Sequence, residues 1–265
     1  MTATHVTLAK LHGLGNDFLV ALDVEANAAV ARRLCERHTG LGADGLITSR
    51  LLGPGGPVFD FRLWNADGSE AEMSGNGMRC LAQAALDAGW VVEGQPFEVA
   101  TPAGTRQVTV NRRGPAGTWG RGGMGEVDLR GDARICNVGR GQMLVGVGNP
   151  HLVILGSDPA DIDVPALGAE IERSVEGGIN VEFVALGPEV DSITMRVWER
   201  GVGETRACGT GSVAAAAAVH YWGRAGSAVT VHQPGGSVGV TLAPDGTATL
   251  AGPAEKIATC QVAAW

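Results

Sequence analysis

Two glycine-rich segments, half a chain apart, constrain the fold of this sequence more than any other feature. One reads SGNG at residues 74–77 and the other CGTG at 208–211, 134 positions apart in a chain of 265 residues. Each follows a strand-like run and a polar loop, and each precedes a run of helical length. Because the chain contains 41 glycines, one such turn could recur by chance. The matched order of strand, loop, reactive-type residue and helix instead predicts two similar halves related by a pseudo-twofold axis.

Short apolar runs bounded by Gly, Pro, Asn or Asp predict strands in both halves. In the first half they span 6–10, 18–22, 58–64, 97–100 and 107–110, and in the second half 143–147, 152–155, 181–185, 192–197, 229–232, 239–242 and 247–250. Helices are expected over 26–37, 77–88 and 211–222, and the last two are stopped by Gly89 and Gly223. The glycine-rich stretch 114–125 reads as a linker or hairpin loop between the halves.

Composition excludes several classes of function. The net charge is −8 and no Lys/Arg-rich run occurs, so neither nucleic acid nor an anionic membrane is the expected partner. The N-terminus lacks the features of a secretory signal, and no apolar run reaches about 18 residues, so a cytoplasmic protein is expected. The five cysteines are far apart, lack zinc-like spacing and are odd in number, which argues against a metal site and a disulfide framework.

The two helix starts carry the chemistry that the sequence suggests. A helix N-terminus presents free N–H groups and a positive dipole end, which can hold a carboxylate and lower the pKa of a cysteine placed there. Cys208 has this position, so it departs from the usual inert buried thiol. Two such starts facing one another would remove an α-proton on one side of an amino acid and return one on the other. Only Lys10 and Lys256 occur and neither lies in a pyridoxal motif, so we expect no cofactor and no metal.

At this point the sequence resembles the diaminopimelate epimerases over nearly its whole length. The matching stretches are KLHGLGNDF (10–18), GLGADG (40–45), WNADGSEAEMSGNGMR (64–79), VGNPH (147–151), GINVEF (178–183), VWERGVGETRACGTG (197–211) and GPAEKI (252–257). The resemblance implies an α/β (α+β) fold of two pseudo-symmetric halves, each a mixed β-sheet curled around a central helix. It implies an N-terminal half of residues 1–121 plus 253–265 with the Ser74 helix, and a C-terminal half of 122–252 with the Cys208 helix.

The resemblance also implies an activity and a site. The activity is cofactor-independent interconversion of LL- and meso-diaminopimelate, an isomerase step in lysine and cell-wall precursor biosynthesis, in a possible homodimer. Cys208 matches one catalytic cysteine, and Ser74 stands where the family has the other. Substrate contacts map onto Asn16, Asn65, Gly75, Asn76, Asn149, Asn180, Glu199, Arg200, Gly209 and Thr210, and His151 and Glu199 match positions that shape the site. Cys80 lies nearly two turns inside its helix and is expected in the core.

Ser74 leaves alternatives open, because a serine hydroxyl is a far weaker acid than a thiol and no base stands near it in sequence. The chain could be an engineered Cys→Ser variant with impaired catalysis, or carry a natural Ser/Cys pair. A racemase of another amino acid on the same fold, a binding-only homologue and a thiol hydrolase built on Cys208 also remain. A hydrolase would need a histidine partner, and neither His151 nor His220 lies in a motif for that role.

Overall fold

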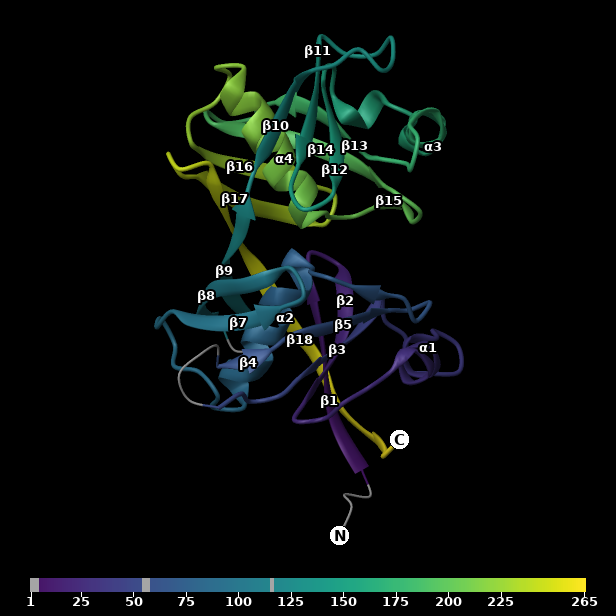
Figure 1. Cartoon of the computed structure of the whole chain (residues 1–265), viewed down its shortest axis with the longest axis vertical. Coiled ribbons are helices and arrows are strands. Elements are labelled where there is room, and N and C mark those ends of the chain that lie inside the picture. The colour runs from purple at the N-terminus through teal and green to yellow at the C-terminus, as the bar shows by residue number, and fades with distance from the viewer. Residues whose placement is uncertain (1–4, 54–57, 115–116) are drawn as a thin grey trace. The chain divides into compact units, whose positions relative to one another are not determined.

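The computed structural model describes residues 5–53, 58–114 and 117–265, which form two compact units (Figure 1). The first unit comprises Met1–Gly122 with Gly252–Trp265, and the second comprises Gly123–Ala251. The chain passes from the first unit to the second within β9 (Gly117–Glu126) and returns within β18 (Thr247–Ala263). The C-terminal strand thus completes the first unit, because the end of β18 pairs antiparallel with β1 (His5–Gly13).

The first unit is a mixed sheet with two helices. Besides β1 and β9, its strands are β2 (Asn16–Leu22), β3 (Gly45–Ser49), β4 (Phe59–Asp60), β5 (Arg62–Asn65), β6 (Glu70–Ala71), β7 (Phe97–Thr101) and β8 (Gly104–Arg113), and its helices are α1 (Ala28–Cys35) and α2 (Gly75–Asp87). Strand β2 is antiparallel to β1 and parallel to β3, and β3 pairs antiparallel with β5. Strand β4 is parallel to β7, which continues antiparallel through β8 to β9.

The second unit contains the same kinds of element in the same order. Its strands, besides the start of β18, are β10 (Asp128–Asp132), β11 (Gly141–Gly146), β12 (Pro150–Leu155), β13 (Asn180–Leu186), β14 (Ser192–Glu199), β15 (Gly203–Thr205), β16 (Ala228–Gln233) and β17 (Gly236–Leu242), and its helices are η1 (Pro159–Asp161), α3 (Val164–Ser174) and α4 (Gly209–Tyr221). Strand β12 is antiparallel to β11 and parallel to β13, and β13 pairs antiparallel with β14. Strand β14 is parallel to β16, which continues antiparallel through β17 to β18.

The pairing registers of the two units match residue by residue. In the first unit Leu46 lies opposite Trp64, and in the second Val181 lies opposite Trp198. The two tryptophans are 134 positions apart, the same spacing as the two helix starts. The predicted fold class, a mixed α/β fold of two pseudo-symmetric halves, is confirmed by this shared topology.

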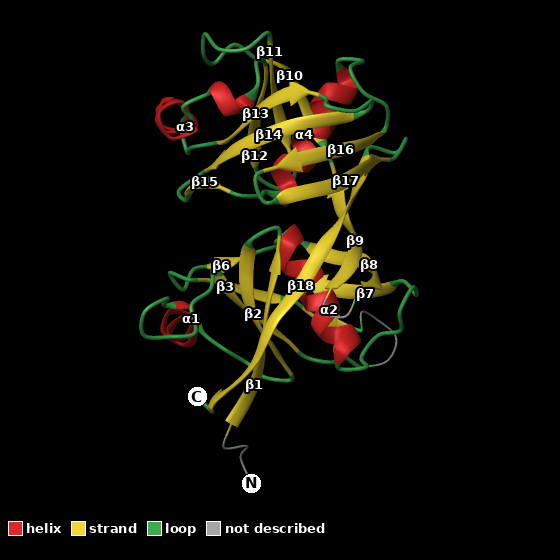
Figure 2. Cartoon of the chain, turned by 180° about the vertical axis from the view of Figure 1, so that it is seen from behind, coloured by secondary structure: helices red, strands yellow, loops and turns green. Residues whose placement is uncertain are grey.

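Each sheet curls around its own central helix, α2 in one unit and α4 in the other (Figure 2). Helix α2 packs its apolar side chains into a core with Phe59, Phe61 and Phe97. Helix α4 has little amphipathic character, because residues 213–219 are Val or Ala and are all buried. Such a helix must be covered on every side, and its small side chains let the surrounding strands approach closely. Within the described parts of the chain, no helix combines the length and hydropathy that a membrane crossing requires.

The structure departs from the predicted elements in two informative places. Helix α3 was not predicted, although Asp163 caps it and Pro165 lies in its first turn. The stretch 114–125, expected as a linker or hairpin loop, is mostly the strand β9 from residue 117 onward, and residues 115–116 lie outside the described part. Glycine lets β9 approach α2 closely, because a Cβ atom on Gly120 would lie 3.1 Å from the buried side chain of Arg79.

Candidate active site

Ser74 and Cys208 occupy the same structural position in the two units. Ser74 caps the N-terminus of α2, where its Oγ accepts a hydrogen bond of 3.0 Å from the Gly77 N–H group. Cys208 caps α4, where its Sγ accepts one of 3.4 Å from the Gly211 N–H group. Their backbone angles are close, with φ/ψ of −142°/124° and −124°/121°. Each side chain therefore lies at the positive end of a helix, among N–H groups that the helix leaves unpaired.

The surroundings of Cys208 raise the pKa of its thiol by more than the positive end of the helix lowers it. Burial raises the pKa of the Cys208 thiol well above its ordinary value, and the charges of Glu199 and Glu182 raise it further. The hydrogen bonds with Thr210 and Gly211 act in the opposite direction and are weaker. The sequence-based expectation of a lowered pKa at this helix start is therefore wrong for this arrangement. The physical reason is that desolvation and two nearby carboxylates outweigh the helix dipole.

Glu199, at the end of β14, is the carboxylate most directly coupled to the thiol. Its Oε1 accepts a hydrogen bond of 2.5 Å from the Thr205 hydroxyl. Burial raises the pKa of Glu199, while hydrogen bonds from Thr205 and Cys208 lower it in part. A carboxyl group with a raised pKa beside a thiol can exchange a proton with it, so Glu199 is placed to act as a base toward Cys208.

A buried histidine and a second carboxylate stand behind the thiol. His151 on β12 and Glu182 on β13 are both fully buried, and Nδ1 lies 2.6 Å from Oε1. The other ring nitrogen, Nε2, lies 2.8 Å from Oδ1 of Asn149. Both ring nitrogens therefore have oxygen partners, and neither is paired with the Cys208 sulfur.

Asn180 and Arg200 lie at the same end of the sheet, and backbone contacts hold both. The Asn180 amide donates to the Pro150 carbonyl oxygen at 2.8 Å, and its Oδ1 accepts from the Arg200 N–H group at 2.9 Å. The Arg200 guanidinium is exposed and donates to the Gly177 carbonyl oxygen at 3.2 Å. Its aliphatic stem covers Gly178, where a Cβ atom would lie 2.9 Å from Cδ.

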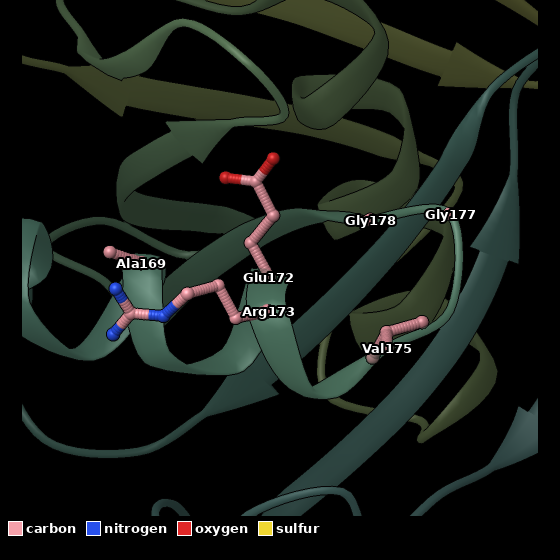
Figure 3. Close-up of a pocket in the computed structure, with 6 residues that line it drawn as sticks. All are labelled: Ala169, Glu172, Arg173, Val175, Gly177 and Gly178. Atoms are coloured by element: carbon pink, nitrogen blue, oxygen red, sulfur yellow. The ribbon is translucent and has the colours of Figure 1, made fainter.

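A surface pocket of about 510 Å³ opens at the end of α3 (Figure 3), and Gly178, which the Arg200 side chain covers, is part of its lining. It is lined by Ala169, Glu172, Arg173, Val175, Gly177 and Gly178. Glu172 is engaged in holding α3 to the end of β14, because it accepts from the Trp198 indole N–H group at 2.6 Å and from the Gly201 N–H group at 2.9 Å. None of the lining residues is a sequence-predicted site residue, and the pocket does not include Cys208.

The first unit offers Ser74 a different environment. The repeat places Phe18 and Ile47 where the second unit has His151 and Glu182, so the acid–histidine pair has no counterpart there. Within the described residues of the first unit, Ser74 has no carboxylate or imidazole hydrogen-bonded to its hydroxyl. In the described part of the first unit, serine at this position thus has no counterpart of the carboxylate that is coupled to Cys208.

The asparagines of the first unit form a chain of hydrogen bonds next to the Ser74 helix start. The buried guanidinium of Arg79 donates to Asn76 Oδ1 and to the Gly75 carbonyl oxygen. Asn76 Nδ2 donates to Asn16 Oδ1 at 3.2 Å, and Asn16 Nδ2 donates to Asp44 Oδ2 at 2.8 Å. Burial lowers the pKa of Arg79 to about 10. Both the oxygen and the nitrogen of each amide are engaged in this chain, so Asn16 and Asn76 are oriented by their neighbours.

The structure therefore divides the sequence-predicted residues between two clusters. The second unit gathers Asn149, His151, Asn180, Glu199, Arg200, Cys208, Gly209 and Thr210, and the first unit gathers Asn16, Ser74, Gly75 and Asn76. Asn65 is exposed at the end of β5 and donates to the Ser69 hydroxyl at 2.9 Å. Cys80 is fully buried in the first core, as predicted.

Sequence reasoning missed several residues that shape these clusters, among them Glu182, Arg79 and Gln233. Gln233 accepts the Cys208 N–H group at 2.8 Å through its side-chain oxygen. Glu182 was within reach of sequence analysis, because a single acid between the apolar residues Val181 and Phe183 of a predicted strand is unusual unless it is paired. No group of three or more His, Cys, Asp or Glu side chains suited to a metal occurs in the described residues.

Comparison with known proteins links the chain to one family. The sequence model of the family described as diaminopimelate epimerase matches residues 8–129 and 143–257. A diaminopimelate epimerase of Desulfitobacterium hafniense is 35% identical over 94% of this chain and 95% of its own length. A diaminopimelate epimerase of Corynebacterium glutamicum is 38% identical over 97% of this chain and 98% of its own length.

Solved structures with more distant sequences share the fold. A hydroxyproline epimerase from Agrobacterium vitis superposes with a TM-score of 0.72 at 18% identity, covering 99% of this chain and 93% of that one. A probable proline racemase from Agrobacterium radiobacter superposes with a TM-score of 0.73 at 19% identity, covering 97% and 93%.

Proposed function

This chain belongs to the diaminopimelate epimerase family, and on that premise we propose that it interconverts LL- and meso-diaminopimelate by two-base proton transfer at the α-carbon. Cys208 acts on one face of the carbon and position 74 on the other. The observation that carries the proposal is the equivalence of these two helix caps in a duplicated topology. A duplicated fold supplies two similar helix starts, which is what a reaction at two opposite faces requires.

In one direction of the reaction Cys208 is the base, and Glu199 assists it. Glu199 takes the thiol proton, and the thiolate is then stabilised by the Gly211 N–H group and the positive end of α4. A substrate ammonium group entering beside Glu199 offsets its negative charge and lowers the thiol pKa at the moment of binding. The thiolate then removes the α-proton, and N–H groups of the helix ends stabilise the enolate-like carbanion.

Polar side chains of both units bind the two amino-acid ends of the substrate. The proposed contacts are Asn16, Asn65, Gly75, Asn76, Asn149, Asn180, Glu199, Arg200, Gly209 and Thr210. An asparagine amide can both donate and accept, which suits a ligand that carries ammonium and carboxylate groups at both ends. Arg200 binds the distal carboxylate through two parallel hydrogen bonds, since its guanidinium is exposed and is held by the Gly177 carbonyl oxygen.

Ser74 makes the rates of proton transfer at the two faces of the α-carbon unequal. Its hydroxyl can deliver a proton only slowly, because no acid or base among the described residues of the first unit is hydrogen-bonded to it. Cys208 therefore exchanges the α-proton of one stereoisomer with solvent much faster than the chain completes inversion.

The test is incubation of the protein with LL-diaminopimelate, and separately with meso-diaminopimelate, in deuterium oxide. Proton NMR follows loss of the α-proton signal, and chiral chromatography follows the stereochemistry. We expect deuterium incorporation into one isomer with little inversion, and none after Cys208→Ala. Absence of incorporation from both isomers, in a folded protein, would refute the proposed activity.

A binding-only homologue is the second candidate, and Ser74 is the observation that favours it. Such a protein would bind diaminopimelate in a calorimetric titration without any α-proton exchange. A racemase of another amino acid would instead exchange the α-proton of a basic amino acid faster than that of diaminopimelate. A thiol hydrolase is disfavoured, since both ring nitrogens of His151 are engaged with Glu182 and Asn149.

The same proposal includes the setting of the reaction. The chain acts on a small amino acid in the cytoplasm, as part of lysine and cell-wall precursor biosynthesis, without a metal or organic cofactor. It assembles as a homodimer, as expected from the resemblance to the family.

A further inference from the structure

The contacts of His151 determine how many protons are held by the buried cluster of His151, Glu182 and Asn149. A neutral imidazole has one N–H donor and one acceptor. Here Nδ1 faces a carboxyl oxygen of Glu182 and Nε2 faces the amide oxygen of Asn149, at 2.6 and 2.8 Å. Two hydrogen bonds to two oxygen atoms require two protons in the cluster. Either the imidazole carries both, or Glu182 carries one and donates it to Nδ1. The His151–Glu182 pair has zero net charge in both cases.

The alternative is an ionised Glu182 beside a neutral histidine, with the Asn149 amide turned to donate to Nε2. That arrangement buries a net negative charge. Glu182 is fully buried, its Oε2 has no hydrogen-bond partner among the described residues, and Cys208 and Glu199 lie close enough to feel its charge. Burying an uncompensated carboxylate next to another acid is costly, so the neutral pair is favoured.

We propose that Glu182 is a positioning residue that acts through His151 to orient the Asn149 amide, so that Asn149 offers N–H donors to a carboxylate of the substrate. With Oδ1 held by His151, the amide nitrogen is the free end of the side chain. Nδ2 has no hydrogen bond among the described residues and is not enclosed. An N–H donor binds a carboxylate, whereas the turned amide would present an oxygen and repel it.

Glu182 itself is locked in place. A Cβ atom on Gly211 would lie 2.7 Å from its Oε1 and 3.3 Å from the Cys208 sulfur, so the carboxyl group packs against the first turn of α4. The first unit has Ile47 at the corresponding position and Phe18 in place of His151. Its counterpart of Asn149, Asn16, is oriented by Asn76 and Asp44 instead. At these equivalent positions, the acid–histidine pair therefore occurs in the second unit, which carries Cys208, and not in the first.

The first test is independent of activity. In protein labelled with ¹⁵N-histidine, long-range ¹H–¹⁵N correlation at pH 8 reports whether Nε2 of His151 holds a proton, with the signal assigned by its loss in His151→Gln. We expect a protonated Nε2 in the wild type and in Glu182→Gln, whose amide can donate to Nδ1 as a neutral carboxyl does. An unprotonated Nε2 in the wild type overturns the proposal, whether or not the variants fold.

The second test rests on the proposed function and uses steady-state kinetics or α-proton exchange with diaminopimelate. Glu182→Leu removes the partner of Nδ1, so the Asn149 amide loses its fixed orientation and KM rises about tenfold with a smaller change in kcat. Glu182→Gln restores KM to within about threefold of the wild type. The matched control is Glu189→Leu, because Glu189 pairs with His232 at 2.9 Å in the same unit but outside the site, and its KM stays unchanged.

The outcomes of the two proposals are separable. A wild-type protein that neither exchanges nor inverts diaminopimelate refutes the proposed function, and the ¹⁵N result still decides the role of Glu182. A Glu182→Leu variant that folds and keeps the wild-type KM refutes the positioning role, even if the wild type is a fully active epimerase.

Discussion

At the scale of single residues, Cys208 and Glu199 form a coupled pair in which two opposing effects meet. The helix end and its N–H groups favour a thiolate, while burial and neighbouring carboxylates raise the pKa of the thiol. Burial also raises the pKa of Glu199. Because both pKa values are raised, Cys208 and Glu199 share a proton when no substrate is bound. A cationic group of the substrate that arrives beside them favours the thiolate form of Cys208.

Replacing Glu199 with glutamine tests this pairing through stability and rate together. A carboxyl group whose pKa is higher in the folded than in the unfolded chain stabilises the fold at low pH, and that stability is lost as pH rises through the folded pKa. Glu199→Gln should therefore raise Tm relative to the wild type at pH 8, by about 3 °C, and less at pH 5. It should also lower α-proton exchange about 100-fold, because the thiol loses its base.

Differential scanning fluorimetry at the two pH values and deuterium incorporation provide the measurements. The matched control is Glu176→Gln, an exposed carboxylate of the same unit, which should change neither quantity. A lower Tm for Glu199→Gln at pH 8 would contradict the raised pKa of this group.

At the scale of elements, the first turns of the central helices α2 and α4 pack against different side chains. Gly77 and Gly211 are equivalent in the repeat, yet a Cβ atom meets different neighbours at each. At Gly211 it would lie 2.7 Å from the Glu182 carboxyl, and at Gly77 it would lie 3.1 Å from the end of the Ile47 side chain. A buried carboxyl tied to a histidine cannot move aside, whereas the tip of an isoleucine can.

The two glycines therefore respond differently to alanine. Gly211→Ala should lower Cys208-dependent α-proton exchange about 100-fold, because a shift of about 1 Å misplaces the thiol. Gly77→Ala should lower it by no more than about threefold, since alanine also favours the helix. Deuterium incorporation measured by NMR, with circular dichroism to establish folding, compares the pair. Equal losses in the two variants would contradict the different packing.

At the scale of the whole molecule, duplication gives each unit its own core and its own helix start. The pairing partners, the parallel crossover and the capped central helix recur in the same order. The halves then diverge in chemistry, with a thiol, an acid pair and a histidine in one, and in the other a serine with Phe18 and Ile47 at the positions equivalent to the histidine and Glu182. The proposed function requires both halves to act on one carbon atom, and on that proposal the residue at position 74 is limiting for inversion.

Ser74→Cys tests that inference. If position 74 is the second acid/base, a thiol there should raise epimerase turnover about 100-fold while α-proton exchange at the Cys208 face changes little. Turnover is followed by chiral chromatography of LL- and meso-diaminopimelate. Ser157→Cys, which adds a thiol at an exposed position of the second unit, is the control and should give no gain. If Ser74→Cys gave no gain either, position 74 would not be the second acid/base.

The sequence by itself predicted the features that depend on neighbours in the chain. The helix starts at 74 and 208 follow from a small polar cap and glycines within three residues, and the repeat follows from comparing the chain with itself. The tryptophans at a matching spacing and the core position of Cys80 were accessible in the same way. These interactions are local, so sequence pattern alone identifies them.

Only the tertiary structure decided which side chains surround the thiol and how they act on it. Glu182 approaches Cys208 from a strand 26 positions earlier, and burial there reversed the predicted direction of the thiol pKa. Helix α3 escaped prediction because Gly168 in its middle is explained only by Trp198, which a Cβ atom would approach to 2.5 Å. Desolvation and packing depend on atoms far apart in the chain, and strand pairing across the sheet brings them together.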